Sequence, residues 1–166
     1  MGLILVLKKY ILLFLVSMVP IVELRGGIPI GVGYGIDLWL CYIICVIGNI
    51  VPVPFIIFFG KQILYRLAKI KKIGPFFQKI IDRADRKAKT IGKAEFWGLY
   101  IFVAIPLPGT GAWTGSLIAT ILQMRLKKAI PAIALGVITS GIIMLVVSLL
   151  VKNGIITGID LFNGYA

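Results

Sequence analysis

Two stretches of the chain are long enough and apolar enough to cross a bilayer as single helices. Residues 38–59 are 22 consecutive uncharged residues, and residues 129–151 are 23. A helix needs about 20 such residues to span the roughly 30 Å hydrocarbon core of a membrane. The first stretch contains Asn49, Pro52 and Pro54, which predicts a kink in its second half. We therefore expect two transmembrane helices.

Two further apolar stretches are interrupted in the middle, which predicts helical hairpins. Residues 10–36 begin with 13 uncharged residues and then reach the sequence ELRGGIP at 23–29, and residues 96–124 are 29 uncharged residues broken by PLPGTG at 106–111. Ten helical residues rise only about 15 Å, which is half of the hydrocarbon core. Half-helices of this length predict re-entrant hairpins. Because unpaired backbone groups at membrane depth must be covered by protein or reached by water, we expect the turns to border a polar pocket.

The two halves of the chain resemble each other. IPIGVG at 28–33 is similar to IPLPGTG at 105–111 with one inserted proline, and a long apolar stretch follows each. The expected fold is an all-α integral membrane protein of one domain, residues 1–166, built as an inverted repeat of hairpin and transmembrane helix with interfacial amphipathic helices between. An inverted first hairpin would place Lys8 and Lys9 outside, whereas a full crossing would keep them inside, and we favour the hairpin.

Residues 61–95 separate the two halves and carry most of the positive charge. Of the 18 lysines and arginines, 11 lie between Lys61 and Lys93, against two aspartates there. Apolar residues recur at helical spacing among these charges, which predicts amphipathic helices at an interface. The positive-inside rule places the segment on the cytoplasmic side of a multi-pass plasma-membrane protein, in contact with anionic lipid head groups. This location argues against nucleic acid as the partner that a net charge of +12 would otherwise indicate.

The composition restricts the chemistry of the chain. Sixty per cent of the residues are hydrophobic, and there is no histidine. The two cysteines, Cys41 and Cys45, lie in an apolar run without clustered carboxylates, so we expect no metal, cofactor or disulfide. There is no paired carboxylate and no nucleophile with a base, so we expect no catalytic residue and no enzyme. Lys8 and Lys9 follow the apolar start, so a cleavable signal peptide is not expected either.

Glu23 and Arg25 are the strongest candidates for a functional site. They are the only charged residues between Lys9 and Asp37, and a charge at membrane depth costs roughly 2.5–3.5 kcal/mol, so it is a functional hypothesis by default. The alternative is an interfacial salt bridge that only ends a helix. Arginine suits bidentate phosphate recognition, and a desolvated glutamate can exchange a proton. The full set of candidate substrate- or ion-binding residues is Glu23, Arg25, Gly26, Gly27, Pro29, Asn49, Pro106, Pro108, Gly109, Thr110, Gly111 and Trp113.

The other candidates have more than one possible role. Thr110 is the one hydroxyl in the second turn, and the glycines on either side of it allow close backbone approach. Trp113 could be a wedge between hairpins, an interfacial anchor or a substrate contact. For Asn49, hydrogen bonding between helices is favoured over ligand binding.

The interrupted motifs, ELRGGIPIG at 23–31 and IPLPGTGAWTGSLIA at 105–119, resemble the family called small multidrug export proteins, over most of the chain. The two-hairpin pattern is also similar to the wider DedA/VTT superfamily. This resemblance implies movement of lipids between leaflets, including polyprenyl phosphate carriers, with Glu23 as the acidic residue before the first break. DedA-type second hairpins carry an arginine near the turn, which this chain lacks. Arg25 would therefore be the only arginine of the expected site.

These features predict a membrane transporter with a polar pocket between two hairpins. We favour translocation of a phosphate-bearing lipid. The alternatives are proton- or ion-coupled export of small cationic compounds and, third, a scaffold that does not transport. Gly31-x-x-x-Gly35 and Gly111-x-x-x-Gly115 allow close helix packing, and two spans make a thin wall around a pocket, so we expect a homodimer.

Overall fold

The computed structural model describes residues 2–71, 74–88 and 92–152, which form eight α-helices. Their bounds are α1 (Gly2–Met18), α2 (Glu23–Gly33), α3 (Leu38–Ile50), α4 (Pro52–Ala68), α5 (Gly74–Ala88), α6 (Gly92–Ala104), α7 (Ala112–Ile121) and α8 (Leu126–Lys152). Both ends of the expected domain 1–166, and parts of the basic segment 61–95, lie outside the described residues. The expected all-helical fold is confirmed for the part of the chain that the structure describes.

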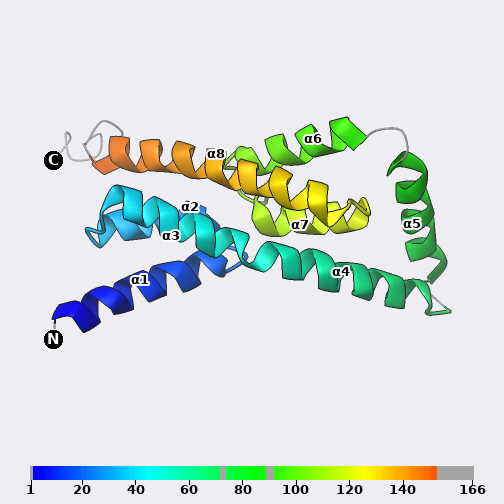
Figure 1. Ribbon diagram of the computed structural model, residues 1–166, viewed down its shortest axis with the longest axis horizontal. Coiled ribbons are helices and arrows are strands. Elements are labelled where there is room, and N and C mark those ends of the chain that lie inside the picture. Colours follow the sequence, from blue (N-terminus) through cyan, green and yellow to red (C-terminus); the bar gives the residue numbers. More distant parts are fainter. Residues whose placement is uncertain (1, 72–73, 89–91, 153–166) are drawn as a thin grey trace, which may run out of the picture.

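Two long helical elements are apolar enough to cross a membrane (Figure 1). α3 and α4 form nearly one rod over 31 residues, Leu38–Ala68, because the N–H of Val51 between them still donates to the Ile47 carbonyl. Pro52 takes the first position of α4, where its missing N–H costs little. The second element is α8, with 26 residues from Leu126 to Val151. At 1.5 Å per residue, each exceeds the roughly 30 Å hydrocarbon core.

α4 extends past residue 59, the end of the predicted span 38–59, and ends at Ala68. Lys61 and Arg66, which we expected in an interfacial segment, belong to this helix. The Lys61 amino group donates to the carbonyl of Met124 at 2.6 Å, just beyond α7, and α4 packs along α7. The next helix, α5, begins only at Gly74 and lies across the end of the molecule (Figure 1). α8 likewise begins three residues before the predicted start at residue 129.

α1 and α2 form the first hairpin, with its turn at residues 19–22. The predicted break at 23–29 is wrong, since Glu23 starts α2 and Pro29 lies inside this helix. The glycines in this stretch allow close packing and do not end the helix. A Cβ on Gly27 would lie 2.5 Å from Ser17 Oγ of α1, so α2 approaches its neighbours more closely than side chains would permit.

α6 and α7 form the second hairpin, and its break lies where the sequence predicts. α6 ends at Ala104 and α7 begins at Ala112, with the Pro-Gly turn between them. Gly109 has a φ of +85° and Gly111 a φ of +136°, which side-chain-bearing residues rarely adopt. These two glycines let the chain reverse within seven residues.

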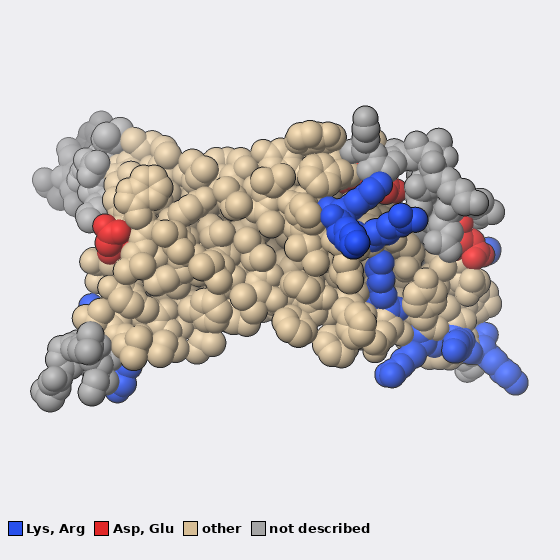
Figure 2. Space-filling model, in the orientation of Figure 1, with Lys and Arg blue, Asp and Glu red and all other residues tan. Residues whose placement is uncertain are grey.

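The two hairpins lie toward opposite ends of the molecule, and their turns meet near its middle (Figure 1). α1 packs on α3, and α2 packs on α3 and on the C-terminal part of α8. α6 packs on α8, while α7 packs on α4 and α8. Figure 2 shows the charged side chains of this face gathered at the two ends, with uncharged surface between. Large apolar side chains are exposed over this surface, including Ile43, Ile47, Phe55, Leu135 and Ile142. An exposed apolar surface of this size, with the charges at its two ends, is typical of a membrane protein.

Candidate functional site

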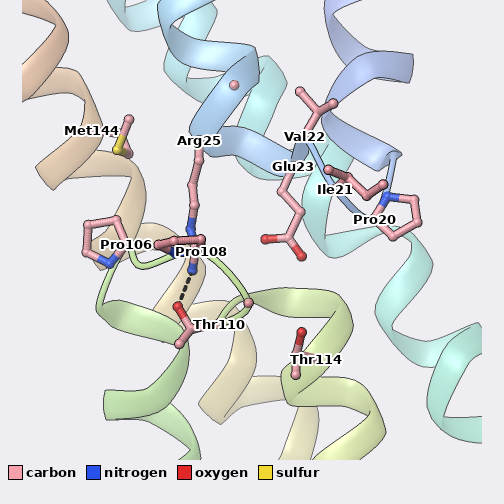
Figure 3. A pocket seen from close by; sticks show the side chains of 12 residues that line it. Pro20, Ile21, Val22, Glu23, Arg25, Pro106, Pro108, Thr110, Thr114 and Met144 are labelled. Atoms are coloured by element: carbon pink, nitrogen blue, oxygen red, sulfur yellow. Dashed lines mark hydrogen bonds between the residues drawn. The ribbon is translucent and has the colours of Figure 1, made fainter.

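A cavity of about 540 Å³, here called the central cavity, lies where the two hairpin turns meet (Figure 3). Seven of the twelve candidate residues line it, and they come from both hairpins. Its lining residues are Pro20, Ile21, Val22, Glu23, Arg25, Gly26, Pro106, Pro108, Gly109, Thr110, Thr114 and Met144. The structure thus brings together two motifs that lie about 80 residues apart in the sequence.

Glu23 binds the N-terminal end of α7. Its side chain is 4% exposed, and its Oε1 accepts a hydrogen bond from the backbone N–H of Trp113 at 3.1 Å. The N–H of Ala112 is a second donor to the same carboxylate. The first N–H groups of a helix have no partner within it and carry the positive end of its dipole. Glu23 therefore caps a helix of the other hairpin, in place of a capping side chain on α7 itself.

Gly111 is required for this approach. A Cβ at this position would lie 2.1 Å from Oε2 of Glu23, which is far inside van der Waals contact. The backbone of Gly111, with φ of +136° and ψ of −170°, is also a conformation that only glycine adopts readily. Gly111 thus allows the turn and also leaves room for the Glu23 carboxylate.

Arg25 binds the other side of the same break. Its guanidinium donates to the carbonyls of Leu107 and Ile105, the latter at 3.3 Å, and to the Thr110 hydroxyl at 2.7 Å. Figure 3 shows the side chain reaching from α2 into the second turn. These carbonyls follow the C-terminal end of α6, where the helix dipole is negative. Arg25 therefore neutralises the end of α6, as Glu23 neutralises the start of α7.

The two charges are thus divided between the two ends of one broken helix. The sequence left open whether Arg25 folds back to Glu23, and in the structure its hydrogen bonds go to the second hairpin instead. A charge at a helix terminus stabilises it by about 0.3–1 kcal/mol, and by up to about 2 kcal/mol in partly buried geometry. Electrostatic interactions of this size stabilise the two helix ends at the break between α6 and α7.

Trp113 and Asn49 lie next to the contact between Glu23 and the start of α7. The Trp113 indole N–H donates to the carbonyl of Met18 at 2.9 Å, which is the last residue of α1. Trp113 is therefore a wedge between the hairpins. Asn49 is 1% exposed, and its side chain bonds to the Glu23 carboxylate, while its own Oδ1 has no partner. Asn49 therefore connects α3 to the site.

Two candidates lie away from the central cavity. Gly27 packs against Ser17 and Cys45, and Pro29 borders a different cavity between α2 and α8. Sequence reasoning also missed members of the lining. Pro20 could have been noticed as a proline within an apolar run, but nothing in the sequence distinguishes Met144, which is 121 residues from Glu23 and reaches the site through α8 packing on α2.

The described residues hold no group of three or more side chains of the types that bind metals. Cys41 and Cys45 are free and buried, and the Cys41 thiol contacts the carbonyl of Ile28 at 3.6 Å. These thiols pack α3 against α2.

The fold and the site define a helical membrane protein in which a buried glutamate and a half-buried arginine join two hairpins around a cavity. Comparison with protein families matches residues 23–143 to the family described as "Putative small multi-drug export protein". The match covers well over half of the chain, so the protein belongs to this family. It includes both halves of the site, from Glu23 to α8. Comparisons with curated proteins and with solved structures gave no match.

Proposed function

We propose that the protein exports small amphipathic cations through the central cavity in exchange for protons bound at Glu23. The observation that carries this proposal is the position of Glu23, a buried carboxylate that lines the cavity and also holds the two hairpins together. A cation in the cavity and a proton on the carboxylate compete for the same negative charge. Binding of one therefore favours release of the other.

The coupling follows from the hydrogen bonds of Glu23. A hydrogen bond to a charged group contributes about 1.5–3 kcal/mol, against about 0.5–1.5 kcal/mol for a neutral pair. Protonation of Glu23 would thus weaken its bonds to Trp113 and Ala112 by about 1–2 kcal/mol, which is roughly a tenfold shift in a two-state equilibrium. The proton would loosen the contact between hairpin turns and open the cavity to one side.

The orientation of the protein belongs to the same proposal. The basic end that holds α5 lies in the cytoplasm by the positive-inside rule, together with the start of α8, where Arg125, Lys127 and Lys128 lie. The two hairpins are then re-entrant from opposite sides of the plasma membrane, and the halves α1–α4 and α6–α8 form an inverted repeat. The inverted repeat is supported by Figure 1, where the α1–α2 hairpin and the α6–α7 hairpin reach the middle of the molecule from opposite ends. In this orientation Lys8 and Lys9 would lie outside.

A second candidate is translocation of a phosphate-bearing lipid, as in the DedA-like interpretation of the sequence. Arg25 favours it, since three of its five N–H donors are used by the second hairpin and its Nε has no partner. Ile21 on the cavity rim is 93% exposed, so acyl chains could remain in the bilayer. The basic segment would attract anionic lipid in either case, and a second copy of the chain would complete the thin wall around the cavity.

Transport in proteoliposomes separates the two candidates. Uptake of ethidium under an imposed pH gradient and exchange of a fluorescent polyprenyl phosphate between leaflets would be measured separately. If the protein is an exporter, the wild type should transport ethidium and Glu23→Gln should not. Glu95→Gln, a matched change outside the central cavity, should transport ethidium like the wild type. Lipid exchange that Arg25→Ala abolishes and Glu23→Gln preserves would replace the proposal by the second candidate. Neither activity in folded, inserted protein would favour the scaffold.

A further inference from the structure

A second cavity, here called the distal cavity, has a volume of about 420 Å³ and lies between α2 and α8. It is mostly apolar. Its lining residues are Pro29, Val32, Gly33, Val147, Ser148 and Val151. These residues come from the parts of α2 and α8 that lie beyond the central cavity, toward the end of the molecule opposite α5 (Figure 1).

The distal cavity continues the central cavity along the same pair of helices. On α2 the linings are only three residues apart, at Gly26 and Pro29, and on α8 they are three apart, at Met144 and Val147. Three helical residues rise about 4.5 Å. Less than one helical turn therefore separates the two cavities along the contact between α2 and α8, here called the α2–α8 seam. Figure 3 shows Met144 on the α8 side of the central cavity.

The wall of the seam on α2 has few side-chain atoms. Gly26, Pro29 and Gly33 recur at spacings of three and four, which places them on one face of the helix. A Cβ at Gly33 would meet no atom within 4 Å, so this position opens into free space. Pro29 has no N–H to donate to the carbonyl of Arg25 four residues earlier, so the seam also lacks one backbone hydrogen bond.

Ser148 supplies a polar group that has no partner among the described residues. Its side chain is 7% exposed, and its hydroxyl makes no hydrogen bond. Among the other buried hydroxyls of the described residues, Ser17, Ser116 and Thr120 each donate to the carbonyl four residues earlier. Ser140 also has no partner there, but it is not among the residues that line the central or the distal cavity. The Ser148 hydroxyl is therefore left for a partner that enters the distal cavity.

We infer that the distal cavity is a second substrate station, through which the compound leaves the central cavity along the α2–α8 seam. This inference rests on the proposed export function. The occupant is the exported amphipathic cation, whose apolar body contacts the valines and Pro29 while a polar group of the compound bonds to Ser148. Because the seam leads away from the basic, cytoplasmic end, the station lies on the outward side of Glu23.

One test blocks the station. Gly33→Trp places a bulky side chain where the structure has open space, and Gly98→Trp is the matched control, because a Cβ there also meets no atom within 4 Å. We expect Gly33→Trp to reduce ethidium transport at least tenfold while ethidium binding in detergent changes less than twofold. Gly98→Trp should transport like the wild type. Equal transport by both variants would overturn the inference and leave the export proposal standing, whereas a wild type that transports nothing would count against the export proposal.

A second test does not depend on transport. Ser148→Cys would be labelled with a membrane-impermeant methanethiosulfonate, with Val146→Cys, whose native side chain is 48% exposed on the outside of α8, as the control. Cys41 and Cys45 are fully buried and set the background rate. We expect Ser148→Cys to react faster than Val146→Cys, only with reagent added on the side away from the basic end, and ethidium to slow the reaction several-fold. Labelling no faster than the control, or unchanged by ethidium, would overturn the inference.

Discussion

Gly111→Ala should break the contact between the hairpins at one defined place. The new Cβ would lie 2.1 Å from Oε2 and 2.8 Å from Cδ of Glu23, so the carboxylate has to move away from α7. Its charge-assisted hydrogen bond to Trp113 contributes about 1.5–3 kcal/mol. The backbone conformation of Gly111 adds a strain of about 1–3 kcal/mol for alanine. We expect a total loss of about 3–5 kcal/mol in the free energy of unfolding.

A double-mutant cycle in detergent, with unfolding followed by circular dichroism, separates the two contributions. In a Glu23→Ala background the clash is absent, so Gly111→Ala should cost only the strain of about 1–3 kcal/mol. Gly109→Ala is the control for strain alone, since Gly109 also has a positive φ but its Cβ would meet no atom within 4 Å. An equal loss in the free energy of unfolding on Gly111→Ala in both backgrounds would refute the proposed contact between Glu23 and the start of α7.

Two further substitutions test the other links between the hairpins. Arg25→Lys keeps the charge but loses the planar guanidinium that reaches two carbonyls and the Thr110 hydroxyl. The free energy of unfolding should fall by about 1.5–3 kcal/mol, so thermal unfolding should occur at a lower temperature. An unchanged melting temperature would contradict this. Trp113→Phe keeps an aromatic ring but removes the N–H that donates to Met18 and part of the indole, so it should cost at least about 1 kcal/mol in the same assay. Trp97→Phe, on the exposed surface, loses the same atoms and should cost nothing measurable.

The sequence predicted the membrane class and the second break for clear physical reasons. Long uncharged runs have few alternatives to membrane helices, and two prolines with two glycines between residues 106 and 111 cannot continue a helix. The first break could not be placed, because Gly26, Gly27 and Pro29 have the composition of a turn. Their helical state depends on close packing against α1 and α3, which local propensity does not contain.

The candidate site was also predicted only in part. Glu23 and Arg25 stood out because isolated charges in an apolar sequence need partners, and the residues of the second turn stood out as helix breakers. The pairing of these two motifs, with each charge on the matching end of a broken helix, could not be read from either motif alone. Thr114 and Met144 are ordinary helix residues, which enter the cavity only through tertiary packing. The extension of α4 to Ala68 was missed because its lysines and arginines indicate an interface, while Lys61 in fact bonds to the end of α7.

Proton release on substrate binding is the most direct test of the central claim that cation and proton compete for Glu23. Ethidium would be added to purified protein in weakly buffered detergent solution, and the proton release would be measured with a pH indicator. We expect release from the wild type and from Glu95→Gln, and none from Glu23→Gln. Equal release from Glu23→Gln, or ethidium binding to the wild type without release of protons, would contradict it.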